Sequence, residues 1–397
     1  MKILHESKDL TLSVEIQNVR RDSGEVILPL SSDEGDNLEV SIFDLDCKIE
    51  KVIGFSYYAQ AVTTPDYNAE GFSELKFRTQ EGQIKIGYLF PLPTICNPDS
   101  DLYKSETSEF TKGYALGGII ALLSSNTEHL INQSAIWGRQ YKLSEIYQED
   151  TSILVISPEK AGVSIEKCND FISNHFPMLA KHGAFLDYKI RGKKHTPKSL
   201  KKPEETIYLE PKSPEIDELA FQYLKDVVMA SESNPKTPLY HFFLQYQFME
   251  ILMNGAFKNI MSEFSEVSQK TDYISSPWKL KKLSQKLNEK CSEQSRLNKI
   301  FEAANTSCSE SIEELKDKCK EFLQSSTDLE RILENGEDLN SLSPSKLLYR
   351  VRNCVFHGFG LYKISEDELF EICQSFSQLI YELATRLGPL SKSLEAS

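Results

Sequence analysis

The hydrophobic pattern of this 397-residue chain changes its period once, near residue 205. Before that point, short stretches alternate apolar and polar residues, and Gly, Asn, Asp and Pro separate them; they cover 11–17, 38–46, 74–79 and 83–90. A period of two is typical of strands with one buried face. After residue 214, apolar residues recur at helical spacing. We therefore expect an α+β protein, with a β-rich mixed α/β domain over 1–205 and an all-α helical bundle over 212–397.

Individual elements follow from the same patterns. In the first domain we expect helices over 114–133 and 164–182 and strands over 151–156 and 184–190. In the second domain we expect helices over 214–230, 238–264, 278–304, 309–324, 343–357 and 365–386. The boundary is placed in 196–214, a stretch rich in proline and lysine. Short connections between the later helices favour antiparallel neighbours.

Composition narrows the class of protein. The formal net charge of −14 is too acidic for a protein that coats duplex nucleic acid, so any such contact must be local. The basic stretch 189–202 is most simply a solvated linker, with a phosphate-contacting surface as the alternative. The longest nearly charge-free apolar run, 114–123, is half of the ~20 residues that a membrane helix needs. We expect no membrane segment.

The cysteines and histidines predict neither a metal centre nor a disulfide framework. The eight cysteines form no C-x-x-C pair and do not cluster with histidines at zinc spacing. The first ten residues lack the hydrophobic segment of a secretory signal. We therefore expect a cytoplasmic protein with reduced thiols and with no metal or cofactor.

One short motif carries chemistry. Arginine is scarce, with 10 Arg against 35 Lys, yet two arginines fall within residues 349–358, YRVRNCVFHG. Arg352 and Asn353 are followed by His357, and glycines at 358 and 360 predict that the helix ends directly afterwards. The helix dipole favours a cationic imidazole in this last turn. Asn353 and His357 are one helical turn apart, so the amide oxygen can accept from a ring N–H and orient the ring. Arg352 projects about 100° away and could reach a phosphate.

This R-N-x3-H-G pattern, in the last third of a helical bundle, resembles the signature of HEPN domains (higher eukaryotes and prokaryotes nucleotide-binding). That family carries R-x4-6-H, often with a polar residue directly after the arginine, as Asn353 is here. The resemblance covers about 212–397 and does not extend to 1–205, and an Apea-like branch from bacterial antiphage systems is nearest. The branch that pairs with a nucleotidyltransferase has R-x4-H-x-Tyr, whereas this chain has Phe359, which puts tyrosine modification there in doubt.

The resemblance implies a metal-independent endoribonuclease that acts as a toxin in antiviral defence by abortive infection. Arg352 and His357 would be catalytic and Asn353 would orient the imidazole, while Arg350 and Lys346 would lie at the RNA-facing rim or in solvent. The family's sites are shared between two protomers, so a homodimer through the bundle is expected. The N-terminal domain would then sense a phage-derived trigger or a partner chain.

Other interpretations stay open. The chain could be a catalytically silent HEPN protein that binds RNA or a partner, because an arginine and a histidine at a helix end can serve packing and capping. A ribonuclease gated by a cyclic oligonucleotide is less favoured, because the chain does not begin with a Rossmann-type βα unit. Glu250 is either a buried partner for an arginine or an ordinary surface residue. We expect the aromatic residues of 240–248 to lie in the core of the bundle rather than to stack on bases. We also expect Cys354 to be a core residue.

Overall fold

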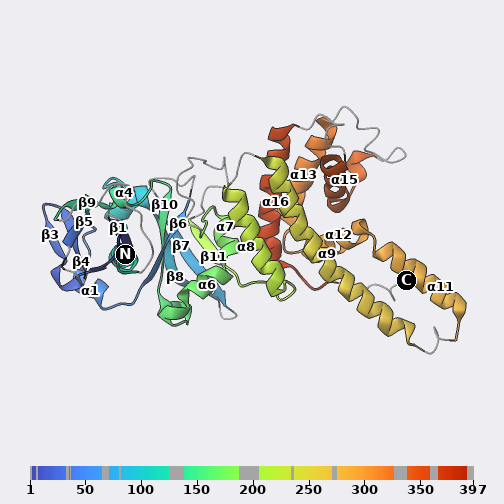
Figure 1. The fold of residues 1–397 in the computed structure, drawn as a ribbon, viewed down its shortest axis with the longest axis horizontal. Helices are drawn as coiled ribbons and strands as arrows, with labels where there is room; N and C mark the ends of the chain where they lie inside the picture. Colours follow the sequence, from blue (N-terminus) through green and yellow to red (C-terminus); the bar gives the residue numbers. More distant parts are fainter. Residues whose placement is uncertain are drawn as a thin grey trace. The chain divides into compact units, whose positions relative to one another are not determined.

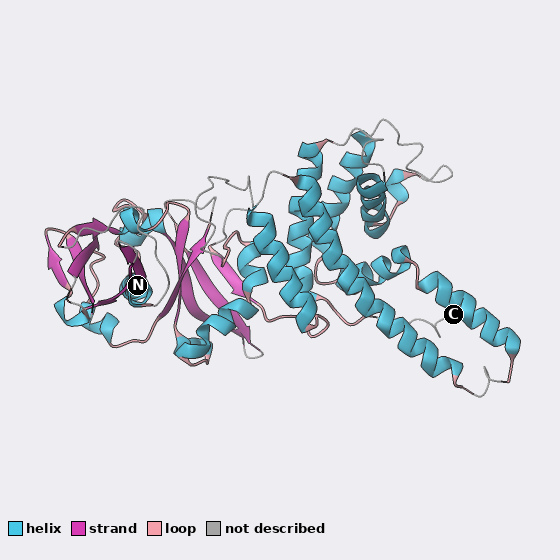
Figure 2. Cartoon of the chain, viewed as in Figure 1, coloured by secondary structure: helices cyan, strands magenta, loops and turns pink. Residues whose placement is uncertain are grey.

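The fold is that of a computed structural model. It describes residues 2–5, 8–32, 35, 37–64, 71–79, 82–125, 138–186, 205–233, 237–270, 275–325, 338–357 and 365–390. The chain divides into two compact units, residues 1–210 and 211–397. The first contains two sheets and the second is helical, so the predicted α+β class is confirmed (Figures 1 and 2).

Two sheets form the first unit. One has the strand order β1-β2-β4-β5-β9, with β3 paired to β4; the strands are β1 (Lys2–His5), β2 (Lys8–Val14), β3 (Arg20–Asp22), β4 (Glu25–Ser32), β5 (Asn37–Phe43) and β9 (Gln140–Lys142). The other has the order β11-β7-β8-β10-β6; the strands are β6 (Tyr58–Thr63), β7 (Ser73–Thr79), β8 (Gly82–Pro91), β10 (Thr151–Ile156) and β11 (Thr206–Leu209). Pairing is antiparallel except for β5 with β9 and β7 with β11. The first unit therefore extends past residue 205, because β11 belongs to its sheet.

Three helices of the first unit cover the two faces of the second sheet. The described helices of this unit are η1 (Ile16–Asn18), α1 (Ile49–Ile53), α2 (Leu92–Cys96), η2 (Asp101–Tyr103), α3 (Glu109–Ser124), α4 (Leu143–Ile146), α5 (Pro158–Ala161), η3 (Ile165–Lys167), α6 (Cys168–Asn174) and α7 (Phe176–Lys181). Helix α3 lies between the two sheets and shares one core with both, while α6 and α7 cover the opposite face. Strand β10 is buried on both sides: Ile153 and Val155 face α3, and Leu154 and Ile156 face α6 and α7.

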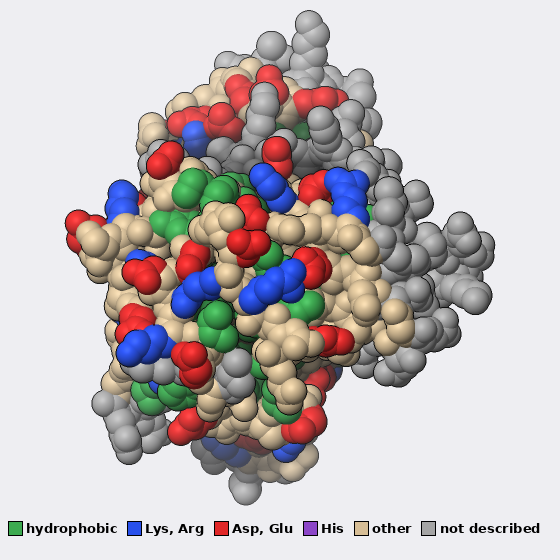
Figure 3. Space-filling model, turned by 90° about the vertical axis from the view of Figure 1, so that its left-hand side faces the viewer, with side chains coloured by type: hydrophobic (Ala, Val, Ile, Leu, Met, Phe, Trp, Pro, Cys, Tyr) green, Lys and Arg blue, Asp and Glu red, His purple; other side chains and the backbone are tan. Residues whose placement is uncertain are grey.

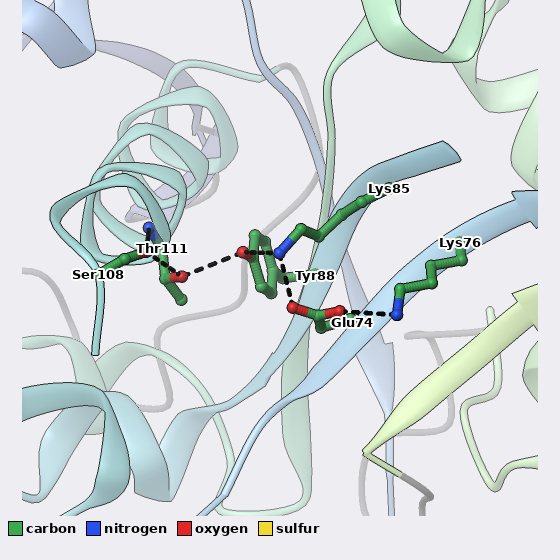
Figure 4. A network of polar contacts seen from close by, with 6 residues as sticks. All are labelled: Glu74, Lys76, Lys85, Tyr88, Ser108 and Thr111. Atoms are coloured by element: carbon green, nitrogen blue, oxygen red, sulfur yellow. Dashed lines mark hydrogen bonds and ion pairs between the residues drawn. The ribbon is translucent and has the colours of Figure 1, made fainter. Parts of the chain in front are cut away.

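A polar network links the second sheet to the start of α3 (Figure 4). The Lys85 ammonium donates to Glu74 at 2.6 Å and to the Tyr88 hydroxyl at 3.0 Å. That hydroxyl lies 3.0 Å from Thr111 Oγ1, and Thr111 N donates to Ser108, the N-cap of α3. Burial by itself would raise the pKa of Glu74, but the hydrogen bonds from lysine lower it. On the face of the molecule in Figure 3, acidic and basic side chains interleave rather than gather by sign.

The second unit is a helical bundle. Its helices are α8 (Glu218–Ser233), α9 (Pro238–Ser268), α11 (Pro277–Lys290), α12 (Glu293–Ala304), α13 (Ser309–Ser325), η4 (Leu339–Ser341), α15 (Pro344–His357) and α16 (Glu366–Arg386). Helix α9 packs against α8, α11, α12 and α16, and α15 packs against α12 and α13. The side-chain amide of Gln245 on α9 donates to the Cys373 carbonyl of α16 at 2.9 Å, which joins two helices of the core.

Several predicted helices differ from the observed ones. The helix predicted over 278–304 is two helices, because Ser292 adopts an extended backbone and its hydroxyl caps α12 by accepting from Ser295 N. The helix predicted over 164–182 is divided into η3, α6 and α7. The break between α6 and α7 lies at His175, two residues before Pro177, which has no N–H to donate. Helix α3 begins at Glu109, five residues earlier than predicted.

The strand predicted over 184–190 lies only in part within the described residues. Phe185 makes an isolated antiparallel bridge with Thr63, and residues 187–190 lie outside the described residues. So do residues 126–133 of the first predicted helix and the whole basic stretch 189–202.

Candidate functional site at helix α15

Helix α15 forms where the sequence predicts it. Ser343 precedes the helix and its hydroxyl accepts from Lys346 N at 3.4 Å, as an N-cap does. The apolar positions Leu347, Leu348, Val351 and Val355 are almost fully buried and fix the helix against α12 and α13. Because these residues define the inner face, the motif residues are turned toward the edges of that face.

Arg352 is held by groups from three helices. Its Nε lies 3.5 Å from Glu293 Oε1 of α12, and its Nη1 donates to Asn353 Oδ1 at 3.2 Å. The guanidinium carbon lies 5.2 Å from the ring centroid of Phe356 and 5.7 Å from that of Tyr246 on α9. The side chain is 19% exposed. Carboxylate, amide and aromatic faces therefore fix the position of the guanidinium.

The Asn353 side chain makes a hydrogen bond to Arg352, in addition to the bond to the imidazole that the sequence predicts. It is half-buried, and its side-chain oxygen accepts from Arg352 Nη1. An amide oxygen has two lone pairs, so this bond leaves one acceptor position. His357 is the last residue of α15, one helical turn after Asn353, and its side chain lies outside the described residues. The predicted contact between Asn353 and the imidazole stays a prediction.

The two residues predicted for the RNA-facing rim lie on the same helix. Lys346 is exposed and Arg350 is half-buried. Cys354, between the motif residues, is 4% exposed, and burial raises the pKa of its thiol to about 11. Such a thiol stays protonated near neutral pH, which supports its prediction as a core residue. Phe359 and the glycines at 358 and 360 lie outside the described residues.

Sequence reasoning missed the two residues that complete this cluster. Glu293 accepts from the Tyr246 hydroxyl at 2.8 Å with the same oxygen that faces Arg352. Burial raises the pKa of Tyr246, and the hydrogen bond to Glu293 raises it further, so the phenol remains a donor. Glu250, the carboxylate considered as an arginine partner, is exposed. No local pattern links Glu293 to Arg352, because 58 residues lie between them in the sequence and only the packing of α12 on α15 brings them together.

The aromatic run of α9 divides into buried and exposed residues. Phe242, Tyr246 and Phe248 are buried, as predicted for bundle core, whereas Tyr240 and Phe243 are exposed. Three rings of this run pack around Phe356 of α15, with centroids 5.6 to 6.2 Å away. The C-terminal end of α15 therefore lies beside the N-terminal part of α9.

Two further observations concern the described residues as a whole. They contain no group of three or more His, Cys, Asp or Glu side chains placed to hold a metal ion. None of their helices is both long and apolar enough to cross a membrane.

Two apolar cavities, of about 490 and 410 Å³, lie along α3 in the first unit and share Val52, Phe55 and Tyr57.

Comparison with protein-family models, with curated proteins and with solved structures found no match to this chain.

Proposed function

We propose that the second unit is a metal-independent endoribonuclease whose catalytic residues are Arg352 and His357, oriented by Asn353. The observation that supports this most is the continuity of α15 from Pro344 to His357. An unbroken helix places Asn353 and His357 one turn apart at its C-terminal end, with Arg352 directly beside Asn353. A proton-transfer group and a fixed cation then share one end of one helix.

The proposed chemistry uses only these groups and the RNA. The ribose 2′-oxygen attacks the adjacent phosphorus and loses its proton, the bond to the 5′-oxygen breaks, and that oxygen gains a proton. The imidazole of His357 transfers a proton, and Arg352 stabilises the extra negative charge on the phosphorane. The products are a 2′,3′-cyclic phosphate and a 5′-hydroxyl end.

The first experiment is RNA cleavage in EDTA followed by analysis of the product ends. His357→Ala should reduce cleavage by ~10²–10⁴-fold because it removes proton transfer. Asn353→Ala should have a milder effect, because it removes a group that orients the imidazole and the guanidinium but leaves both of these groups in place. Circular dichroism of each variant separates loss of chemistry from loss of fold. Unchanged cleavage by His357→Ala, or a strict need for Mg²⁺, would contradict the proposal.

A catalytically silent RNA-binding or partner-binding bundle is the second candidate, and the surroundings of Arg352 favour it. Glu293 already compensates part of the guanidinium charge, and two rings cover it. If this candidate is correct, Arg352→Ala lowers stability and no variant of the motif changes RNA cleavage, because the wild type has none.

The proposal extends to assembly and regulation. We propose a homodimer in which α15 faces its symmetry mate, because one arginine and one histidine make a shallow site. The first unit would restrain the toxin until a phage-derived trigger or a partner chain binds. Light scattering that finds a monomer with full ribonuclease activity would contradict the shared site.

A further inference from the structure

Phe243 presents an exposed aromatic ring next to the end of α15. Its side chain is 40% exposed, although its neighbours Phe242 and Tyr246 on α9 are buried. The ring centroid lies 5.6 Å from that of Phe356, with 60° between the ring planes. A single exposed ring is ordinary on a protein surface. What distinguishes Phe243 is that a packed neighbour holds its ring beside the end of α15, so that its exposed face is available for a contact.

A single ring connects Phe243 to the motif. Phe356 packs against Phe242, Tyr246 and Phe243. The Arg352 guanidinium lies 5.2 Å from the centroid of the same Phe356 ring. Phe243 is therefore two contacts away from the cation that the proposed function assigns to the phosphate.

Charge favours a polyanion as the molecule that covers this ring. Helix α15 contributes Lys346, Arg350 and Arg352 and has no acidic residue, and Glu293 of α12 compensates only part of the Arg352 charge. By contrast, residues 201–397 contain 24 basic and 31 acidic residues, a net charge of −7. A helix with the charge of α15 attracts the phosphates of a nucleic acid. Glu250, exposed two turns further along α9, disfavours phosphates on that side. The phosphates would therefore lie toward α15.

We propose that Phe243 is a stacking site for an unpaired base of single-stranded RNA, adjacent to Arg352. The identity of the ligand as RNA rests on the proposed function; the position of the stacking site rests on the geometry of Phe243 and Phe356. Aromatic side chains accept any base on their π face, whereas bases inside a duplex are already stacked and cannot reach a side chain in this way. The site therefore selects single strands over duplexes without selecting a sequence.

The test is binding of a 2′-O-methyl RNA oligonucleotide, which cannot be cleaved through the 2′-oxygen, to the full-length protein. Phe243→Ala should raise the Kd for the single strand about 5- to 100-fold and leave the Kd for a duplex unchanged. Phe243→Tyr should retain wild-type affinity, because it keeps the ring. The matched control is Phe257→Ala, an equally exposed phenylalanine (38%) on the same helix, about 21 Å further along. It should bind like the wild type.

Phe243→Trp gives an independent readout if the alanine variant is poorly folded, because stacking of a base should quench the new indole fluorescence. Equal effects of Phe243→Ala and Phe257→Ala, no effect of Phe243→Ala, or no quenching would overturn the proposal. Dissociation of a dimer by Phe243→Ala would also overturn it, since a second copy would then cover the ring.

The outcomes also separate this proposal from the proposed function. Binding that depends on Phe243, without cleavage of ordinary RNA, would contradict the nuclease and support the stacking site. Cleavage of ordinary RNA, with binding that does not depend on Phe243, would do the reverse. Failure of the wild type to bind any single strand would overturn both.

Discussion

Arg352 illustrates how one residue can serve the fold and a site at once. Glu293 neutralises part of its charge and Asn353 fixes its plane, so the guanidinium keeps one orientation before any ligand arrives. A side chain that is already ordered loses less conformational entropy when it binds a phosphate. The same ion pair also contributes to stability, so stability and chemistry must be measured separately.

Glu293→Gln separates the two roles of Arg352. Both partners are about four-fifths buried, so loss of the carboxylate charge should lower the free energy of unfolding by about 1–2 kcal/mol, between surface and buried pairs. If Arg352 acts on RNA, this variant should cleave at no less than the wild-type rate. Arg352→Ala should lose ~10²–10³-fold in rate. Urea denaturation and cleavage rates check the two expectations.

A matched variant controls for the loss of an ion pair elsewhere in the bundle. Arg386 on α16 pairs with Glu382 at 3.7 Å and is 26% exposed. Arg386→Ala should therefore lower stability without lowering the cleavage rate. Parallel losses of activity in Arg386→Ala and Arg352→Ala would mean that both act through the fold.

His175 makes the stability of the first unit depend on pH. Its ring is 5% exposed between Phe77 and Phe171, and Nδ1 lies 2.6 Å from the Phe171 carbonyl oxygen, to which it donates. Burial lowers its pKa below the ordinary value of about 6.5. The folded state therefore prefers the neutral ring. Its contribution to stability is complete above about pH 6.5 and is lost as the pH falls below that value.

His175→Asn tests this pH dependence, because the amide Nδ2 replaces the Nδ1 donor and does not titrate. The variant should be less stable than the wild type at pH 7, since ring packing is lost. The difference should shrink between pH 7 and pH 5. Hydrogen exchange of amides in α6 at both pH values measures the effect, and an equal slope in both proteins would contradict it.

At the scale of elements, the glycines of α3 have different reasons to be there. A Cβ at Gly117 would lie 2.4 Å from ring carbons of Tyr57, whereas a Cβ at Gly113 would lie 3.7 Å from Val52 Cγ2, an ordinary contact. Tyr57 cannot easily move, because its ring packs edge-on against Tyr114 at 5.0 Å. Only Gly117 is therefore required by the packing of this ring.

Replacing each glycine by alanine should change stability in opposite directions. Gly117→Ala should destabilise the first unit by about 1–3 kcal/mol through overpacking. Gly113→Ala should stabilise it by about 0.5–1 kcal/mol, because alanine is the better helix former. Denaturant midpoints of the two variants, on one helix and with one chemical change, decide between packing and propensity.

The sequence pattern predicted those elements correctly whose type and ends are determined by neighbouring residues. The continuous apolar run 151–156 predicted a buried strand and became β10, and the N-cap and proline before 345 predicted the start of α15. Breaks were missed at Ser292 and His175, where a local hydrogen bond or an approaching proline competes with an otherwise continuous helical pattern. The placement of Asn353 and His357 one turn apart needed only the helical repeat.

Sequence patterns could not predict contacts between elements that are far apart in the sequence. Glu293 begins α12 and has the ordinary role of an acidic residue in a first turn, so nothing in its neighbourhood indicates a bond to Arg352. Similarly, Phe242 and Phe243 are equivalent in the sequence, and only the packing of α9 decides which one is exposed. The bonding partner of Arg352 and the exposure of Phe243 are therefore determined by tertiary packing.

At the scale of the whole molecule, β11 decides where the first unit ends. It pairs in parallel with β7 over Thr206–Leu209, inside the stretch 196–214 in which the boundary is placed and past the expected domain end at residue 205. Ile207 and Leu209 are buried in the core that α6 and α7 cover. Arg78 of β7 also pairs with Glu210 at 2.9 Å and lies over the ring of Tyr208.

A fragment that ends at residue 210 should therefore be more stable than one that ends at 205. The shorter fragment loses two buried aliphatic side chains, each worth about 1.5–3 kcal/mol, so its free energy of unfolding should be lower by roughly 3–6 kcal/mol. It also leaves β7 as an open sheet edge, which favours association between copies. Urea denaturation and sedimentation of the two fragments check both effects. Equal stability would mean that β11 contributes little to the sheet, and the end of the first unit would then move back toward residue 205.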